Sequence, residues 1–170
     1  HFVTAFLREF GRETERFAGR LELPDAIRSA LPTMSAGVIF AHYSFPYARA
    51  AQIADETLRR AKRATCGKRP AVAWVDVTVD GESPPVWRQS FELTALEGHA
   101  DTLAALGEIG KSGRQTLARL LAHEGHSEEP RAAALLWARR SGHTALQNPL
   151  HDLSLGELRN LVALTRWWKP

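Results

Sequence analysis

The apolar residues at the start of the chain recur at helical spacing. They are Phe2, Val3, Phe6, Leu7 and Phe10. Charged residues such as Arg8 and Glu9 fall on the opposite side, so the pattern predicts an amphipathic helix of roughly two to four turns. Two prolines, Pro24 and Pro32, mark the loop that follows.

A strand–helix pattern comes next. Residues 34–42 (MSAGVIFAH) are apolar and bounded by turn residues, which predicts a strand that is buried on both faces. Gly37 within it indicates a close backbone approach or a bulge. Pro46 suits the first turn of a helix that stops near Gly67. Small and apolar residues at three- and four-residue steps would let this helix pack on a sheet; they are Ala50, Ala54, Leu58 and Ala61.

Two further strands are predicted at 71–79 (AVAWVDVTV) and 87–94, separated by a turn at Asp80 and Gly81. The order is therefore helix, strand, helix, strand, strand. A helix between two strands that can lie parallel is a split βαβ element, as in a ferredoxin-like palm. The predicted fold class is α+β, a partial ferredoxin-like palm followed by helices.

The pattern changes after Gly98. Helical periodicity covers residues 99–109, 112–123, 127–140 and 154–168. Ser154 followed by Glu157 has the spacing of a capping box. We therefore expect two domains: a palm-like domain over 1–97 and an all-helical subdomain over 98–170.

Composition limits the class of protein. The 170 residues are 44% apolar, and 22 basic against 19 acidic residues give a formal net charge of +3. This mild excess suits a protein that meets anionic ligands but does not by itself indicate a nucleic-acid binder. Cys66 is the single cysteine, which fits a reducing cytosol and a cytoplasmic location. No apolar run approaches the roughly 18 residues of a membrane span, so no membrane partner is expected.

A series of short motifs resembles a known family. It runs from Ser35 to His42 (SAGVIFAH), then Pro46, Ala54-Asp55, Ala61-Lys62 and Gly67-Lys68. In this order and spacing it resembles the end of GGDEF-type cyclase palms. His42 and Pro46 make it more similar to the second palm of the large signalling subunit of type III CRISPR complexes. The resemblance covers residues 1–95 well and the tail, which ends in Arg166-Trp167-Trp168, only weakly.

The resemblance implies an activity. Such palms bind ATP, use two metal ions (Mg or Mn) on an acidic Gly-Gly-Asp-Asp turn, and make cyclic oligoadenylates in antiviral defence. Their partners are other CRISPR effector subunits and guide RNA. The acidic turn does not occur in this chain, and the resemblance would place it before Phe2. Because the chain also starts in what reads as the middle of a helix, we expect a C-terminal part of a palm that is inactive alone.

Four residues are candidates for nucleotide binding. Lys62 matches the family lysine that lies near the nucleotide phosphates, although a solvated lysine in a basic cluster is the alternative. Ser35 and Gly37 could let the backbone approach a ligand, or could serve strand packing. His42 lies at a strand end, where sites gather in α/β folds, but it could also be a packed or capping residue.

Two further groups of residues have the chemistry of metal ligands. Asp76 and Asp80 share a strand face and could hold a cation, but a turn beside Gly81 is the better interpretation. His123 and His126 are three residues apart, whereas the zinc motif HExxH needs four. Two alternatives to the enzyme fragment remain open. One is a non-catalytic scaffold for protein or RNA, and the other is a basic RNA-binding domain centred on residues 59–69, which lacks interleaved aromatic residues.

Overall fold

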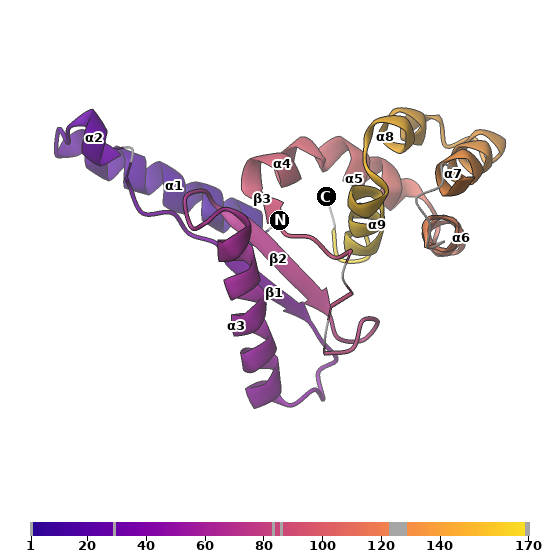
Figure 1. Ribbon diagram of the computed structural model, residues 1–170, viewed down its shortest axis with the longest axis horizontal. Coiled ribbons are helices and arrows are strands. Elements are labelled where there is room, and N and C mark those ends of the chain that lie inside the picture. Colours follow the sequence, from indigo (N-terminus) through magenta and orange to yellow (C-terminus); the bar gives the residue numbers. More distant parts are fainter. Residues whose placement is uncertain (1, 29, 83, 86, 123–128, 169–170) are drawn as a thin grey trace. The chain divides into compact units, whose positions relative to one another are not determined.

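The structure is a computed structural model that describes residues 2–28, 30–82, 84–85, 87–122 and 129–168 (Figure 1). The chain divides into two compact units. Unit 1 comprises residues 1–85 and 90–97, and unit 2 comprises residues 86–89 and 98–170.

Unit 1 is built on a three-stranded mixed sheet in the order β1-β2-β3. The strands are β1 (Ala36–Phe40), β2 (Ala71–Asp76) and β3 (Phe91–Glu92). β1 and β2 are parallel, and helix α3 (Tyr47–Ala64) connects them; β3 is antiparallel to β2. Figure 1 shows α3 lying along these two strands. The predicted α+β class is confirmed, and a helix does connect two parallel strands. The prediction of a split βαβ element is wrong, because β1 and β2 are direct neighbours with no strand between them.

The two parallel strands differ in burial. All six residues of β2 are buried, whereas all five residues of β1 are only half-buried. The prediction that both faces of residues 34–42 are buried is therefore wrong. The physical reason is position: among the described residues β1 has a strand neighbour on one side only, while β2 lies between β1 and β3.

Helix α3 packs on the sheet through Ile53, Thr57 and Ala61, which are buried. It ends at Ala64, before the predicted stop. The N–H of Gly67 donates to the carbonyl of Lys62 at 2.9 Å, and that of Cys66 donates to the carbonyl of Arg63 at 3.2 Å. This is a Schellman cap, in which Gly67 is the second residue past the C-cap Thr65 rather than the end of the helix.

Three helices of unit 1 depart from the prediction. α1 (Phe2–Arg20) is longer than two to four turns, and α2 (Asp25–Arg28) lies within the predicted loop. The predicted strand 87–94 contains only β3, because Leu93 begins α4 (Leu93–Gly98). Leu93 and Leu96 are both buried and three residues apart, so one helical face covers the apolar interior.

Unit 2 is helical. It contains α5 (Ala100–Glu108), α6 (Lys111–Leu121), α7 (Glu129–Arg140), the 3₁₀ helix η1 (Thr144–Leu146), α8 (Gln147–Asp152) and α9 (Leu155–Leu164). Four of these correspond to the predicted helices, and η1 and α8 were not predicted. The core consists mainly of leucines, including Leu103, Leu117, Leu121, Leu150 and Leu161.

Arginine side chains close the C-terminal ends of several helices in unit 2. Arg114 donates to the carbonyl of Ile109 at 2.7 Å, just after α5. Arg131 donates to the last carbonyls of α8, at 2.7 Å from those of Leu150 and His151. Arg159 donates in the same way to Leu121 at the end of α6. These cations satisfy carbonyls that a helix leaves without partners and oppose the negative end of its dipole.

The predicted capping box at the start of α9 is confirmed. The hydroxyl of Ser154 accepts from the N–H of Glu157 at 3.2 Å, and the carboxylate of Glu157 accepts from the N–H of Ser154 at 2.9 Å. The hydrogen bond from the Ser154 hydroxyl, followed by that from its backbone, lowers the pKa of Glu157. The carboxylate therefore stabilises the folded state only while it is ionised.

We expect Glu157→Gln to remove this pH dependence. A carboxyl group whose pKa is lowered in the folded state stabilises the folded protein at pH values above its ordinary pKa, about 4.3 for glutamate. This stabilisation is lost as the pH falls through the folded-state pKa. The variant should lose about 0.5–1 kcal/mol at neutral pH and nothing in acid. Thermal unfolding of both proteins from pH 7 downward measures the difference. A constant difference across this range would contradict the prediction.

Candidate functional site

The βαβ element brings candidate residues to two opposite ends of the sheet. Because β1 and β2 are parallel, their first residues lie at one end of the sheet and their last residues at the other. Helix α3 connects the end of β1 to the start of β2, so its C-terminal turn lies at the end of the sheet where the strands begin. We call that end the basic end, with Ser35 and Lys62, and the opposite end the carboxyl end, with His42.

Ser35 links the starts of the two parallel strands. Its hydroxyl accepts from the backbone N–H of Ala71 at 3.3 Å. Nearby, the hydroxyl of Thr33 donates to the carbonyl of Gly67 at 2.9 Å. Ser35 therefore has a structural role at the basic end, and its contact with a nucleotide stays a prediction.

Gly37 allows the backbone of β1 to approach that of α3. A Cβ atom at this position would lie 2.4 Å from the backbone nitrogen of Leu58 and 2.5 Å from the carbonyl oxygen of Ala54. Both distances are far below van der Waals contact. The close approach indicated by the sequence is thus made to the helix, which accounts for glycine here without a ligand.

Lys62 is exposed and lies in a cluster of cations that are not equally available. Arg59 pairs with Asp55 at 2.7 Å, and Arg69 pairs with Glu92 at 2.9 Å. Lys62, Arg63 and Lys68 are exposed and, among the described residues, have no ion pair. These last three define the cationic surface of the basic end.

Arg60 has a different role in the same helix. Its guanidinium donates to the carbonyl of Trp74 at 2.9 Å. Burial lowers the pKa of Arg60, and repulsion by Arg63 adds to this effect. Arg60 therefore fastens α3 to β2 and is not part of the cationic surface.

The carboxyl end carries exposed aromatic residues. The ring of His42 lies 4.2 Å from that of Tyr43, and its Nδ1 is 2.8 Å from the hydroxyl of Ser44. Tyr43 and Tyr47 are 93% and 87% exposed. His42 is exposed, and the whole of strand β1 lies between it and Ser35, so it is at the opposite end of the sheet from Lys62. The four predicted residues do not form one site.

The acidic residues at the carboxyl end form a turn. Asp76 is buried, and its carboxylate accepts from the N–H of Thr78 at 3.0 Å and from the Thr78 hydroxyl at 2.5 Å. Asp80 accepts from the N–H of Asp76 at 3.2 Å. Within the described ranges, no group of three or more His, Cys, Asp or Glu side chains could hold a metal ion. The described residues alone therefore do not fit a two-metal centre, and His123 and His126 lie outside them.

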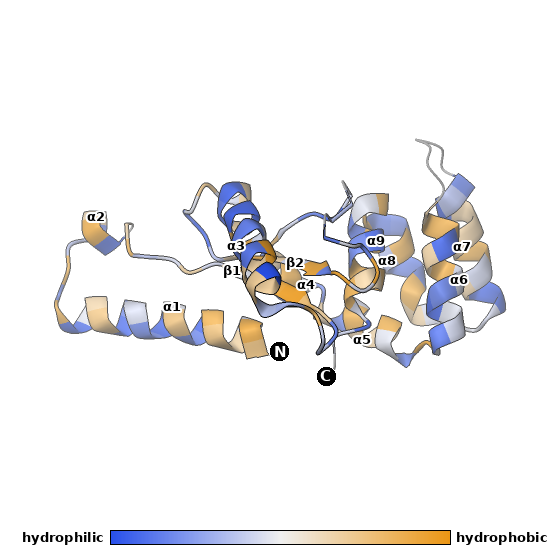
Figure 2. Ribbon diagram, turned by 90° about the horizontal axis from the view of Figure 1, so that it is seen from below, coloured by the Kyte–Doolittle hydropathy of each residue, from blue (hydrophilic) through white to orange (hydrophobic). Residues whose placement is uncertain are grey.

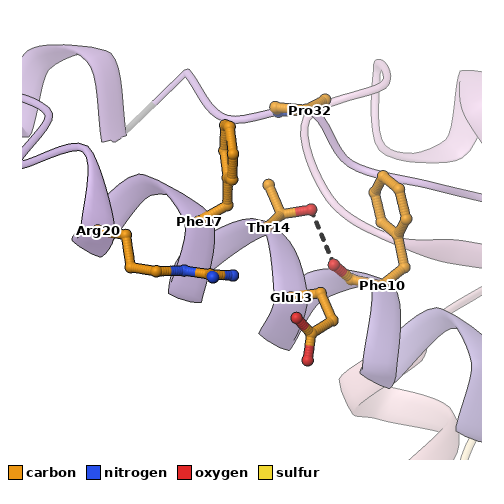
Figure 3. A pocket seen from close by; sticks show the side chains of 6 residues that line it. All are labelled: Phe10, Glu13, Thr14, Phe17, Arg20 and Pro32. Atoms are coloured by element: carbon orange, nitrogen blue, oxygen red, sulfur yellow. Dashed lines mark hydrogen bonds between the residues drawn. The ribbon is translucent and has the colours of Figure 1, made fainter.

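A groove lies on a different part of unit 1, along helix α1 (Figure 3). Its volume is about 420 Å³, and it is lined by Phe10, Glu13, Thr14, Phe17, Arg20 and Pro32. The rings of Phe10 and Phe17 flank Thr14, whose hydroxyl donates to the carbonyl of Phe10 at 2.8 Å. Sequence reasoning missed this groove, although the helical spacing of Phe10 and Phe17 was a signal for it.

No family model, no curated protein and no solved structure matches this chain. Among the helices of the described residues, none is both long enough and apolar enough to cross a membrane.

Proposed function

We propose that unit 1 is the βαβ part of a palm-type nucleotidyltransferase of a type III CRISPR signalling complex, and that its basic end binds the phosphates of ATP. The ordered motifs from Ser35 to Lys68 support this proposal, as does the parallel direction of the two strands that they flank. In such a palm the two metal ions stabilise charge during phosphoryl transfer. The role of the present residues is to hold phosphate, and the metal ligands would come from residues outside this chain.

The observation that carries the proposal is the cationic surface formed by Lys62, Arg63 and Lys68. Within the part of the chain that the structure describes, these side chains form no ion pair that would have to break before they meet an anion. An ammonium group is a compact charge suited to a triphosphate. Because the surface is open to solvent, we expect weak binding, with a dissociation constant of about 1 mM that rises with salt.

We expect Lys62→Ala to raise the dissociation constant for ATP about fivefold, which corresponds to the loss of about 1 kcal/mol from one exposed charge contact. Isothermal titration of the chain with ATP at low salt measures it. Lys111→Ala is the matched control, because Lys111 is also exposed but lies at the start of α6 in unit 2. Equal effects of the two substitutions would mean that ATP binding depends only on the net charge of the chain, and the proposal would fail.

The second candidate function is a non-catalytic scaffold that binds a protein. One observation favours it: α1 exposes several phenylalanine side chains outside the interior of unit 1. Exposed apolar surface of this kind marks interaction sites. It does not require nucleotide binding, so the two functions are separable by experiment.

A further inference from the structure

Helix α1 carries a row of phenylalanines that unit 1 does not cover. Phe2, Phe6 and Phe17 are 82%, 51% and 58% exposed, and Phe10 is half-buried. The rings of Phe2 and Phe6 stack with their centroids 6.2 Å apart. Phe6 and Phe17 are separated by three helical turns and so share a face. We call these four residues the phenylalanine stripe; Figure 2 shows apolar positions recurring along α1.

The residues of the stripe are different from those that pack α1 against the rest of unit 1. The packing residues are Thr4, Leu7 and Ala18, which are 7%, 2% and 0% exposed. An ion pair between Arg8 and Glu97, at 2.6 Å, also fastens the helix. The packing of unit 1 therefore does not account for the phenylalanines, and a contiguous exposed apolar row points to a partner.

The charges beside the stripe indicate which partner. The charges change sign along the helix: Glu9 and Glu13 come first, and Arg16 and Arg20 follow them; all four are exposed. Glu9 and Arg20 are eleven residues apart and share a face, as Phe6 and Phe17 do. Glu9 pairs with Arg12 at 3.2 Å, and Glu13 pairs with Arg16. Both are exposed pairs within one helix, which exchange partners at little cost.

We propose that α1 is the interface between two copies of this chain, with the two helices antiparallel about a two-fold axis. In an antiparallel two-fold pair the same side of each helix meets with its direction reversed. Glu9 then faces Arg20 of the second copy, and Glu13 faces Arg16. A parallel pair would instead oppose like charges, which disfavours that arrangement.

The same alignment positions the apolar residues. Its axis passes midway between residues 9 and 20, so Phe10 and Phe17 lie on either side of it. Phe10 and Phe17 of the two copies then interleave, whereas Phe2 and Phe6 lie opposite residues 27 and 23 of the second copy, beyond the end of α1. The groove between Phe10, Phe17 and Pro32 lies next to this axis and offers about 420 Å³ to a ring from the second copy. A contact that buries aromatic residues at its centre and places charges at its rim has the usual anatomy of an interface.

A charge-swap cycle on the full chain tests the proposal. Analytical ultracentrifugation over a concentration series should show a monomer–dimer equilibrium. Glu9→Arg and Arg20→Glu should each raise the dimer dissociation constant about tenfold, because the two-fold axis repeats every contact. The double variant Glu9→Arg/Arg20→Glu should return to within about threefold of the original value. These residues are eleven positions apart, so no contact within one helix explains the rescue.

Phe17→Ser gives an independent measurement. It removes the ring of the stripe that lies nearest the two-fold axis and should leave the chain monomeric, while its circular dichroism spectrum stays that of the original protein. A chain that is monomeric at every concentration would overturn the proposal, as would a double variant no better than the single ones. Binding of the stripe to a different protein, with no self-association, would also overturn it. None of these outcomes depends on ATP, so the proposed nucleotide site is tested separately.

Discussion

Replacing Gly37 with alanine is expected to lower the free energy of unfolding of unit 1 by about 3 kcal/mol or more. The added Cβ would lie 2.4 Å from the backbone nitrogen of Leu58 and 2.5 Å from the carbonyl of Ala54. Overpacking against side chains costs typically about 1–3 kcal/mol. Here the opposing atoms are helix backbone, so relief requires that α3 move away from β1 along its length. Such a movement would also loosen the buried contacts of Ile53 and Ala61.

Gly11→Ala is the matched control for this substitution. Gly11 lies within α1, and a Cβ there would meet nothing within 4 Å. Alanine at this position should raise the free energy of unfolding by about 0.5–1 kcal/mol, because glycine is unfavourable inside a helix. Urea unfolding measures both variants, and hydrogen exchange of residues 36–64 reports where the change occurs. A Gly37→Ala protein as stable as the original would refute the packing explanation.

Titration of the Gly37→Ala protein with ATP, together with hydrogen exchange, separates the two explanations of Gly37 that the sequence left open. If the glycine serves only α3 packing, stability and ATP binding should fall together. If it admits a ligand, binding should fall while exchange in β1 and α3 remains slow. The prediction of a close approach at Gly37 came from its position inside an apolar strand. What approaches it is a residue of another element, which local spacing does not specify.

The accuracy of the sequence-based fold follows from the same distinction between local and long-range interactions. The helices from Tyr47 to Ala64 and from Leu155 to Leu164 were predicted because their periodicity and caps are local. The capping box of Ser154 and Glu157 is the clearest case, since both partners lie within one turn. Local patterns of this kind survive in the fold with shifts of a few residues at their ends.

Long-range effects account for the errors. An apolar strand has the same sequence pattern whether it has one neighbouring strand or two. The half-buried state of β1 was therefore not predictable from its residues. Residues 87–94 alternate enough to suggest a strand, but Leu93 and Leu96 are buried as one helical face. Tertiary packing decided between these two periodicities.

The candidate site shows a similar limit. The family-like motifs placed Ser35 and His42 in one short series, but a strand lies between them, and they reach opposite ends of the sheet. Lys62 lies at the same end of the sheet as Ser35, because α3 runs back along β1. Among the described residues, Arg59 and Arg69 form ion pairs with carboxylates, whereas Lys62, Arg63 and Lys68 do not. That selection was not visible in a run of basic residues.

Asn160→Ala is expected to lower the free energy of unfolding of unit 2 by about 3 kcal/mol. The Asn160 side chain is completely buried, and its Nδ2 donates to the carbonyl of Gln89 at 2.8 Å. This bond joins α9 to the segment 86–89 within unit 2. Its removal leaves a carbonyl without that donor, which costs about 1–3 kcal/mol, and the lost volume adds a cavity cost.

Asn148→Ala is the control for this prediction. Asn148 is exposed at the start of α8, so its substitution should change the free energy of unfolding by less than about 0.5 kcal/mol.

Asparagine is a weak helix former, yet Asn160 lies inside α9 between the buried residues Leu158 and Leu161. An apolar residue there would improve both helix propensity and the apolar face. The hydrogen bond to Gln89 explains why asparagine is nevertheless present. Hydrogen exchange of α9 and urea unfolding measure the loss, and a change below about 1 kcal/mol would show that the bond to Gln89 does not stabilise unit 2.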